Sequence, residues 1–174
     1  MRKTAIILTT CLCFIVAALC LAACKITYKL NGASIDYTVT KTISIEHMPI
    51  KAALVYAPLA VNFNDKLQSK YIDQTQLQLV RNDGDLQLSG AITGYSLAPQ
   101  AVKADAYAAE TRLTIKVKVK FVNKNNKTEN FEKEFSAYRD FEATQLLTDV
   151  QDGLCDEMVD ELVEEIFNAT VANW

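Results

Sequence analysis

Histidine is nearly absent from this chain of 174 residues, which contains only His47. Enzyme sites generally combine a nucleophile, a base and an orienting group, and one histidine near Pro49 supplies too few of these roles. Metal sites need His or Cys ligands at suitable spacing, and the sequence has none so placed. A glycine-rich loop of the kind that holds phosphate is absent too. We therefore expect a protein that is not an enzyme and that uses no metal or other cofactor.

Long apolar runs are also absent, apart from one at the N-terminus. Arg2 and Lys3 precede an apolar stretch that begins at Ala5 and ends in Leu21-Ala22-Ala23-Cys24. A basic start, an apolar centre and small residues before a cleavage point are typical of a secretory signal peptide. The last four residues resemble the lipobox of bacterial lipoproteins, which implies a signal peptide over 1–23 and acyl chains on Cys24. Two or more acyl chains would anchor the rest of the chain stably to a bilayer.

An uncleaved transmembrane helix is the alternative for this stretch. Roughly 18 apolar-leaning residues lie between Lys3 and Cys24, which is at the short limit of a membrane span, and threonines dilute them. Other cysteines are weaker acylation candidates. Cys11 leaves too short an apolar region, and Cys20 follows Leu19, which is not small.

Basic residues are in deficit once the signal peptide is removed. The segment 24–174 retains 16 of the 18 basic residues, because Arg2 and Lys3 are lost, and all 21 acidic ones. Its net charge is therefore −5 with His47 neutral. Nucleic-acid binders are normally basic, so we expect no nucleic-acid partner. A length of 151 residues suits one domain.

Disulfides are excluded within the segment 24–174. Cys155 is the only cysteine after Cys24, so it has no partner thiol in the same chain. It falls on the apolar side of a predicted helix. Burial in apolar surroundings raises the pKa of a thiol, so we expect Cys155 to be buried and inert.

Apolar periodicity predicts one α+β domain over 42–174, after a polar lead over 24–41. Alternating apolar residues predict strands, and a spacing of three to four predicts helices. Two helices would cover one face of a mostly antiparallel sheet of four to five strands, forming a two-layer sandwich. The predicted elements are strands at 42–47, 76–81, 85–96, 111–122 and 130–138, helices at about 57–71 and 145–168, a turn at 82–85, a candidate bulge at Gly90 and a loop at 97–110.

The strand predicted at 111–122 carries a row of cations on one face and apolar residues on the other. We call the cations the cation row: Arg112, Lys116, Lys118 and Lys120. Four cations on one strand face are able to hold phosphate groups. The alternative is a solvated sheet face. In that case Glu132 and Glu134, on the next strand, would neutralise the lysines across the hairpin.

The last predicted helix carries acidic side chains over nearly half of its surface. Paired carboxylates occur in glycosidases, but these lie on the outer face of a helix and no aromatic residues flank them. We expect a solvated face or a docking surface. The residues are Asp156, Glu157, Asp160, Glu161 and Glu164.

Five segments carry a family resemblance: Asn82-Asp83-Gly84-Asp85-Leu86, Gly90-Ala91-Ile92-Thr93-Gly94-Tyr95, Glu110-Thr111-Arg112-Leu113-Thr114-Ile115-Lys116-Val117, Phe135-Ser136-Ala137-Tyr138-Arg139-Asp140-Phe141 and Asn173-Trp174. Together with the lipobox and the order of elements, they resemble the LPS-assembly lipoprotein family (LptE-like) over nearly all of 24–174. The resemblance implies a non-enzymatic outer-membrane lipoprotein. It would sit inside an LptD-type β-barrel translocon, help the barrel fold, plug it, and assist insertion of lipopolysaccharide.

The resemblance also bears on position and ligand. The segment Lys25–Lys29 has no Asp or Glu, and so lacks the acidic retention and export signals that some lipoproteins carry after the lipid cysteine. This implies the periplasmic face of the outer membrane. Basic residues of the family are associated with lipopolysaccharide contact, and the cation row is the candidate here. Two other hypotheses stay open: a pilotin-like interaction lipoprotein for a secretion pore, and a lipid-anchored enzyme that uses His47 or Cys155.

Overall fold

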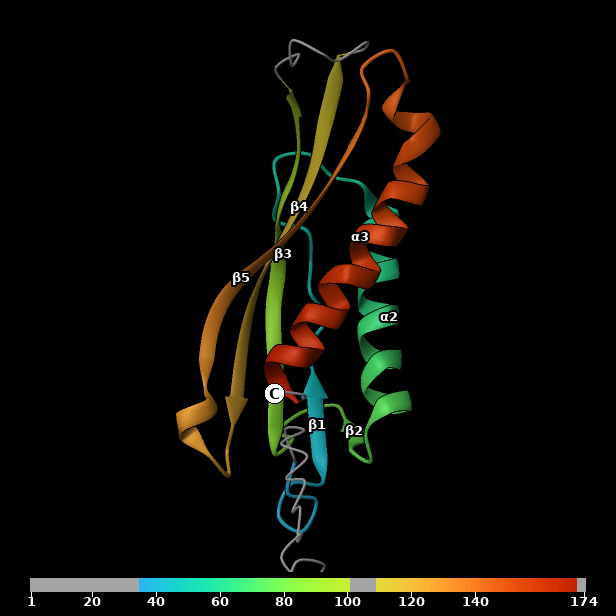
Figure 1. The fold of residues 1–174 in the computed structure, drawn as a ribbon. Helices are drawn as coiled ribbons and strands as arrows, with labels where there is room; N and C mark the ends of the chain where they lie inside the picture. The colour runs from blue at the N-terminus through green and yellow to red at the C-terminus, as the bar shows by residue number, and fades with distance from the viewer. Residues whose placement is uncertain (1–34, 101–108, 172–174) are drawn as a thin grey trace, which may run out of the picture. The chain divides into compact units, whose positions relative to one another are not determined.

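The computed structural model describes residues 35–100 and 109–171. These residues form five strands, two α-helices and one short 3₁₀-helix, as the apolar periodicity predicts for the strands and α-helices (Figure 1). In chain order the elements are β1 (Thr42–Ile45), α2 (Ala57–Gln74), β2 (Gln78–Val80), β3 (Leu86–Pro99), β4 (Glu110–Asn123), η1 (Lys127–Glu129), β5 (Phe131–Glu142) and α3 (Leu147–Thr170).

The sheet has the strand order β2-β1-β3-β4-β5 and is mixed. The short strand β1 pairs in parallel with both β2 and β3. The long strands β3, β4 and β5 pair antiparallel, so most paired residues are antiparallel, as predicted. In the segment 82–85, predicted as a turn, the chain bends at Asn82 and Asp85, and Asp83 adopts a φ of 62°. This segment does not join neighbouring strands, because β1 lies between β2 and β3.

Two predictions about β3 are wrong. The strand continues through 97–99, which we expected to be loop, because these residues pair with β4 even though their apolar alternation has ended. The bulge falls between Ile92 and Gly94, not at Gly90. Gly90 serves a different need: a Cβ atom there would lie 2.1 Å from the carbonyl oxygen of Lys118 on the neighbouring strand. Part of the predicted loop, 101–108, lies outside the described residues.

The core lies between the inner face of the sheet and the two helices, which lie on one side of the sheet in Figure 1. The predicted apolar stripe of α2 is fully buried: Leu59, Phe63, Leu67 and Tyr71. The buried stripe of α3 comprises Cys155, Met158, Val159, Leu162, Val163, Ile166 and Phe167. Alternate residues of β4 complete the core: Leu113, Ile115, Val117, Val119 and Phe121. The predicted two-layer α+β sandwich is therefore confirmed.

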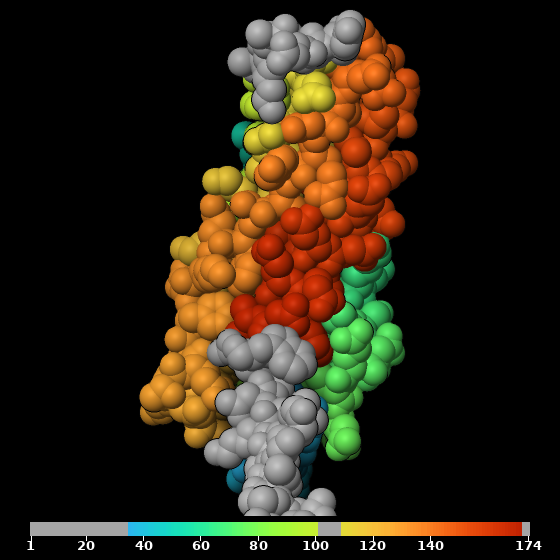
Figure 2. Space-filling model, in the orientation of Figure 1, coloured from blue at the N-terminus to red at the C-terminus, as the bar shows by residue number. Residues whose placement is uncertain are grey.

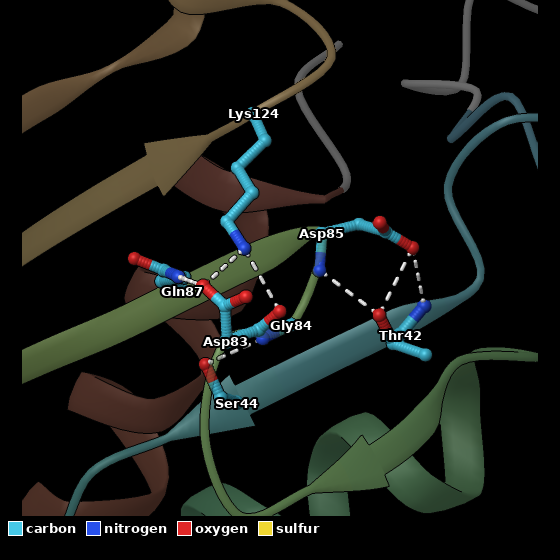
Figure 3. Close-up of polar contacts among 7 residues, drawn as sticks. All are labelled: Thr42, Ser44, Asp83, Gly84, Asp85, Gln87 and Lys124. Atoms are coloured by element: carbon cyan, nitrogen blue, oxygen red, sulfur yellow. Dashed lines mark hydrogen bonds and ion pairs between the residues drawn. The ribbon is translucent and has the colours of Figure 1, made fainter.

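A polar network around segment 82–85 fixes the start of β1 (Figure 3). The Asp85 carboxylate accepts hydrogen bonds from the Lys41 N–H at 2.9 Å, the Thr42 N–H at 3.0 Å and the Thr42 hydroxyl at 2.9 Å. These bonds, led by that from Lys41, hold the pKa of Asp85 below its usual range. A Cβ atom on Gly84 would lie 2.5 Å from the Ser44 nitrogen, so only glycine fits this close approach.

The predictions about the N-terminus fall outside the described residues. The signal peptide, Cys24 and the lead as far as residue 34 belong to that part, as do Asn173 and Trp174. The last part of the lead is described, and Ile35 packs against the core. Among the helices of residues 35–100 and 109–171, none has the length and apolar character needed to cross a membrane.

Candidate functional site: the cation row on β4

The cation row stands on the face of β4 that points away from the helices. Burial alternates along the strand, with Val117 and Val119 in the core and Lys116, Lys118 and Lys120 exposed between them. Because β4 is the fourth of five strands, β3 borders the row on one side and β5 on the other. The strand thus places all four cations on one open sheet surface.

Acidic residues of β5 pair with the lysines of the row, as predicted for the hairpin. The register sets Glu134 across from Lys118 and Glu132 across from Lys120. The ion pairs run diagonally: Lys116 Nζ lies 3.1 Å from Glu134, and Lys118 Nζ lies 2.5 Å from Glu132. The hydrogen bond between Lys118 and Glu132 raises the pKa of the lysine and lowers that of the glutamate.

Arg112 has a different partner, which the sequence did not reveal. Its Nε and Nη2 atoms each donate to a carboxylate oxygen of Asp140 at 2.7 Å, a bidentate pair. The guanidinium also lies 3.9 Å from the ring centroid of Tyr138. Asp140 raises the pKa of Arg112. This contact was missed because β5 continues to Glu142, four residues beyond its predicted end.

The residues of β3 that pair with the three lysines of the row have small side chains. The register places Ser89, Ala91 and Gly94 next to Lys120, Lys118 and Lys116. A Cβ atom on Gly94 would lie 3.0 Å from the Cβ and 3.1 Å from the Cγ of Lys116, so the lysine stem rests on the glycine. The lysine side chains therefore extend further from the sheet than the side chains of their partners on β3.

This arrangement allows the lysines of the row to exchange their glutamate partners for another anionic group. Solvent-exposed ion pairs contribute little to stability, because water and salt screen both charges. An incoming group with several negative charges can therefore replace Glu132 and Glu134 at the lysines without unfolding the sheet. Lys120 makes no ion pair with any residue that the structure describes, which leaves it available.

Comparison with known proteins identifies the family. The family model LptE, described as lipopolysaccharide-assembly, matches residues 40–170. The chain belongs to the LptE family. Membership gives it a role in lipopolysaccharide assembly, within a family of non-enzymatic lipoproteins that associate with the outer membrane. The matched range includes every described helix and strand.

Solved structures are similar to this LptE-family chain at low sequence identity. A protein from Xanthomonas campestris is 12% identical with a TM-score of 0.53, over 76% of this chain and 85% of that one. A minor lipoprotein from Acinetobacter baumannii is 17% identical with a TM-score of 0.48, over 78% and 95%. Lipoprotein B from Nitrosomonas europaea is 13% identical with a TM-score of 0.49, over 76% and 83%. No curated protein matches the chain.

The two residues considered for catalysis lie apart from the cation row. His47 is exposed just after β1. Cys155 is buried in the core as predicted, and burial raises the pKa of its thiol to about 11. The described residues contain no group of three or more His, Cys, Asp or Glu side chains that could hold a metal ion.

The five acidic side chains on the outer face of α3 are 41–65% exposed, as expected for a solvated face, and each also forms an ion pair. Figure 2 shows α3 between β5 and α2. On the α2 side, Lys66 lies 2.7 Å from Asp156 and 2.6 Å from Asp160, and Lys70 pairs with Glu164. On the β5 side, Arg139 lies 3.1 Å from Glu157 and 2.7 Å from Glu161. These carboxylates therefore link the helix to both of its neighbours in the LptE fold.

Proposed function

We propose that this chain is the lipid-anchored partner of an LptD-type β-barrel translocon in the outer membrane. It helps the barrel fold, plugs it, and assists the insertion of lipopolysaccharide. The observation that carries the proposal is the LptE family match over residues 40–170, which spans the whole sandwich. A compact two-layer domain with one open sheet face is suited to fill a lumen, because its other sheet face is already covered by helices.

Anchoring at Cys24 is the second part of the proposal. The lipobox-like Leu21-Ala22-Ala23-Cys24 supports cleavage after residue 23 and acylation of the cysteine. The acid-free segment 25–29 supports the periplasmic face of the outer membrane. The lead to β1 is short enough that the anchor raises the effective concentration of the domain near a membrane partner.

Contact of the cation row with lipopolysaccharide is the third part. The phosphate groups of that lipid are suitable ligands for Arg and Lys side chains. The exposed pairs with Glu132 and Glu134 are exchangeable, and Lys120 is available. Because residues 24–174 carry a net charge of −5, the domain as a whole does not attract anionic lipid. Binding to lipopolysaccharide would therefore come from the local row.

Affinity purification from outer membranes tests the proposal. The chain carries a C-terminal tag, and its interaction partners are identified by mass spectrometry. We expect an LptD-type barrel protein in stoichiometric amount. A Cys24→Ser variant, which has no acylation site, should recover less of it. A secretin in place of the barrel would favour a pilotin-like role, and a monomer without any barrel would contradict the proposal.

A further inference from the structure

A cavity of about 690 Å³ opens at one end of the sandwich. It lies where segment 35–40, the loop around η1 and the last turn of α3 meet. Its volume is within the range of small-molecule sites in proteins. The apolar part of its lining comprises Ile35, Val39, Leu86, Phe121, Phe131, Ala169 and Val171. Phe121 and Phe131 contact each other there, with ring centroids 5.5 Å apart.

The rim of the cavity is a set of asparagines held by hydrogen bonds. Asn123 Oδ1 accepts from the N–H groups of Asn125 and Asn126 at 2.9 and 3.0 Å, and Asn130 Oδ1 accepts from the Asn123 N–H at 2.7 Å. Asn125 Nδ2 donates to the Val39 carbonyl at 3.0 Å. This bond joins the loop to the lead segment. The rim is therefore pre-formed, and ligand binding would not need to order it.

The charge of the lining is negative. Among the lining residues that the structure describes, the charged ones are Asp36 and Glu129. Neither makes an ion pair with another described residue. Thr38 donates its N–H and hydroxyl to Asp36 at 2.9 and 2.6 Å, and the side-chain amides of Asn123 and Asn126 donate to Glu129 at 2.7 and 2.8 Å. All of these donors are neutral, so the groups that hydrogen-bond the two carboxylates add no positive charge to the cavity.

We propose that this cavity binds a small organic cation, an ammonium group on a short body of the ethanolamine or choline type. Carboxylates and amide oxygens accept hydrogen bonds from an ammonium group or attract its charge, and an aromatic ring such as that of the partly exposed Phe131 attracts cations. Phosphate and other anions are disfavoured, since no described basic side chain lines the cavity. This ligand chemistry is the opposite of that suited to the cation row.

Two sources share this chemistry: a free amine and the headgroup of an aminophospholipid. Ile35, at the cavity edge, follows Cys24 by 11 residues. A fully extended segment of that length spans at most about 40 Å, so a lipid surface holding Cys24 is within reach of the cavity. Only this choice of source depends on anchoring at Cys24. The binding of an ammonium group does not depend on the proposed function.

Nuclear magnetic resonance titration of the lipidated mature protein in a sugar-headed detergent tests the proposal. The ligands are ethanolamine and choline as chlorides, with sodium phosphate and ethylene glycol as anionic and neutral controls. We expect saturable shifts of the amides of Asp36, Asn125 and Glu129 with the ammonium compounds alone. A second arm compares added phosphatidylethanolamine with phosphatidylglycerol. A response to the former assigns the lipid source, and a response confined to free amines assigns the soluble source.

Charge-removing variants provide the decisive comparison. Asp36→Asn combined with Glu129→Gln should weaken ammonium binding at least tenfold. The matched double variant Asp65→Asn and Glu142→Gln removes two exposed acids outside the cavity and should leave binding unchanged. If Glu129→Gln disturbs the asparagine loop, Asp36→Asn alone should still weaken binding at least threefold.

Three results would overturn the proposal. The first is the absence of any saturable shift at the lining residues. The second is an equal response to phosphate or glycol. The third is unchanged binding in both the Asp36→Asn and the double variant.

Discussion

Replacing Asn64 with alanine tests how the chain after β1 is tied to α2. Asn64 is 3% exposed and its side chain bridges the two segments. Its Oδ1 accepts from the N–H of Met48 at 2.8 Å, and its Nδ2 donates to the carbonyl of Met48 at 3.0 Å. Nδ2 also donates to the carbonyl of Ala60 at 2.7 Å. Met48 itself is fully buried, so its backbone groups depend on Asn64.

The expected cost follows from these partners. Alanine leaves the N–H and the carbonyl of Met48 buried without a partner, and each such group costs about 1–3 kcal/mol. The carbonyl of Ala60 is less affected, because it lies within α2. Alanine regains up to about 0.7 kcal/mol through its higher helix propensity. We therefore expect Asn64→Ala to lower the free energy of unfolding by about 3 kcal/mol, which corresponds to a fall of roughly 10 °C in Tm for a domain of this size.

Thermal and urea unfolding followed by circular dichroism measures the change. The protein is residues 24–174 with Cys24→Ala, compared with and without Asn64→Ala. Asn62→Ala is the matched control, since Asn62 lies on the same helix and bonds Asp156 at the surface. The control should change the unfolding free energy by less than about 1 kcal/mol. Equal losses in the two variants would refute the reasoning.

Three further predictions concern titration and charge. Cys155, whose pKa is raised by burial to about 11, should not react with a thiol reagent at pH 8 in the folded protein and should react fully in urea; rapid labelling of the folded state would contradict its burial. The pKa of Asp85 is lowered by the Lys41 N–H, and the pKa of Asp156 is lowered by Lys66. Both ionised carboxylates therefore stabilise the folded state, and this contribution is complete above the unfolded-state pKa of about 4. Tm should therefore fall as pH drops through the lower folded-state pKa values, and Asp85→Asn should reduce that dependence. A variant that combines Arg112→Glu, Lys116→Glu and Lys118→Glu should bind lipopolysaccharide more weakly than the unchanged protein, and the difference should shrink at high salt. Unaltered binding would assign the row to a solvated face.

Apolar periodicity was sufficient to predict the elements that form the core. The alternation along β4 and the four-residue stripe of α2 each correspond to buried positions in the structure. The pairing of Lys116 and Lys118 with glutamates also followed from the sequence, because a hairpin with a short turn brings adjacent strands together. Local patterns suffice when the partners are close in the chain.

Features that depend on distant pairing were not predictable in this way. The insertion of β1 between β2 and β3 joins segments about 40 residues apart, and no local pattern specifies it. The continuation of β3 to Pro99 and of β5 to Glu142 comes from backbone pairing with β4, which leaves no apolar signal in exposed residues. The cavity combines the lead, the η1 loop and the end of α3, so its composition emerges only from the fold.

Photo-crosslinking in living cells tests the central claim most directly. A photoreactive amino acid replaces Tyr138, which is exposed on the open sheet face beside Arg112. The same residue at Met48, which is fully buried, serves as the control. If the domain plugs an LptD-type barrel, illumination should yield a covalent adduct with that barrel from position 138 and none from position 48. An adduct with a secretin, or no adduct from position 138 in a folded and localised protein, would contradict the account.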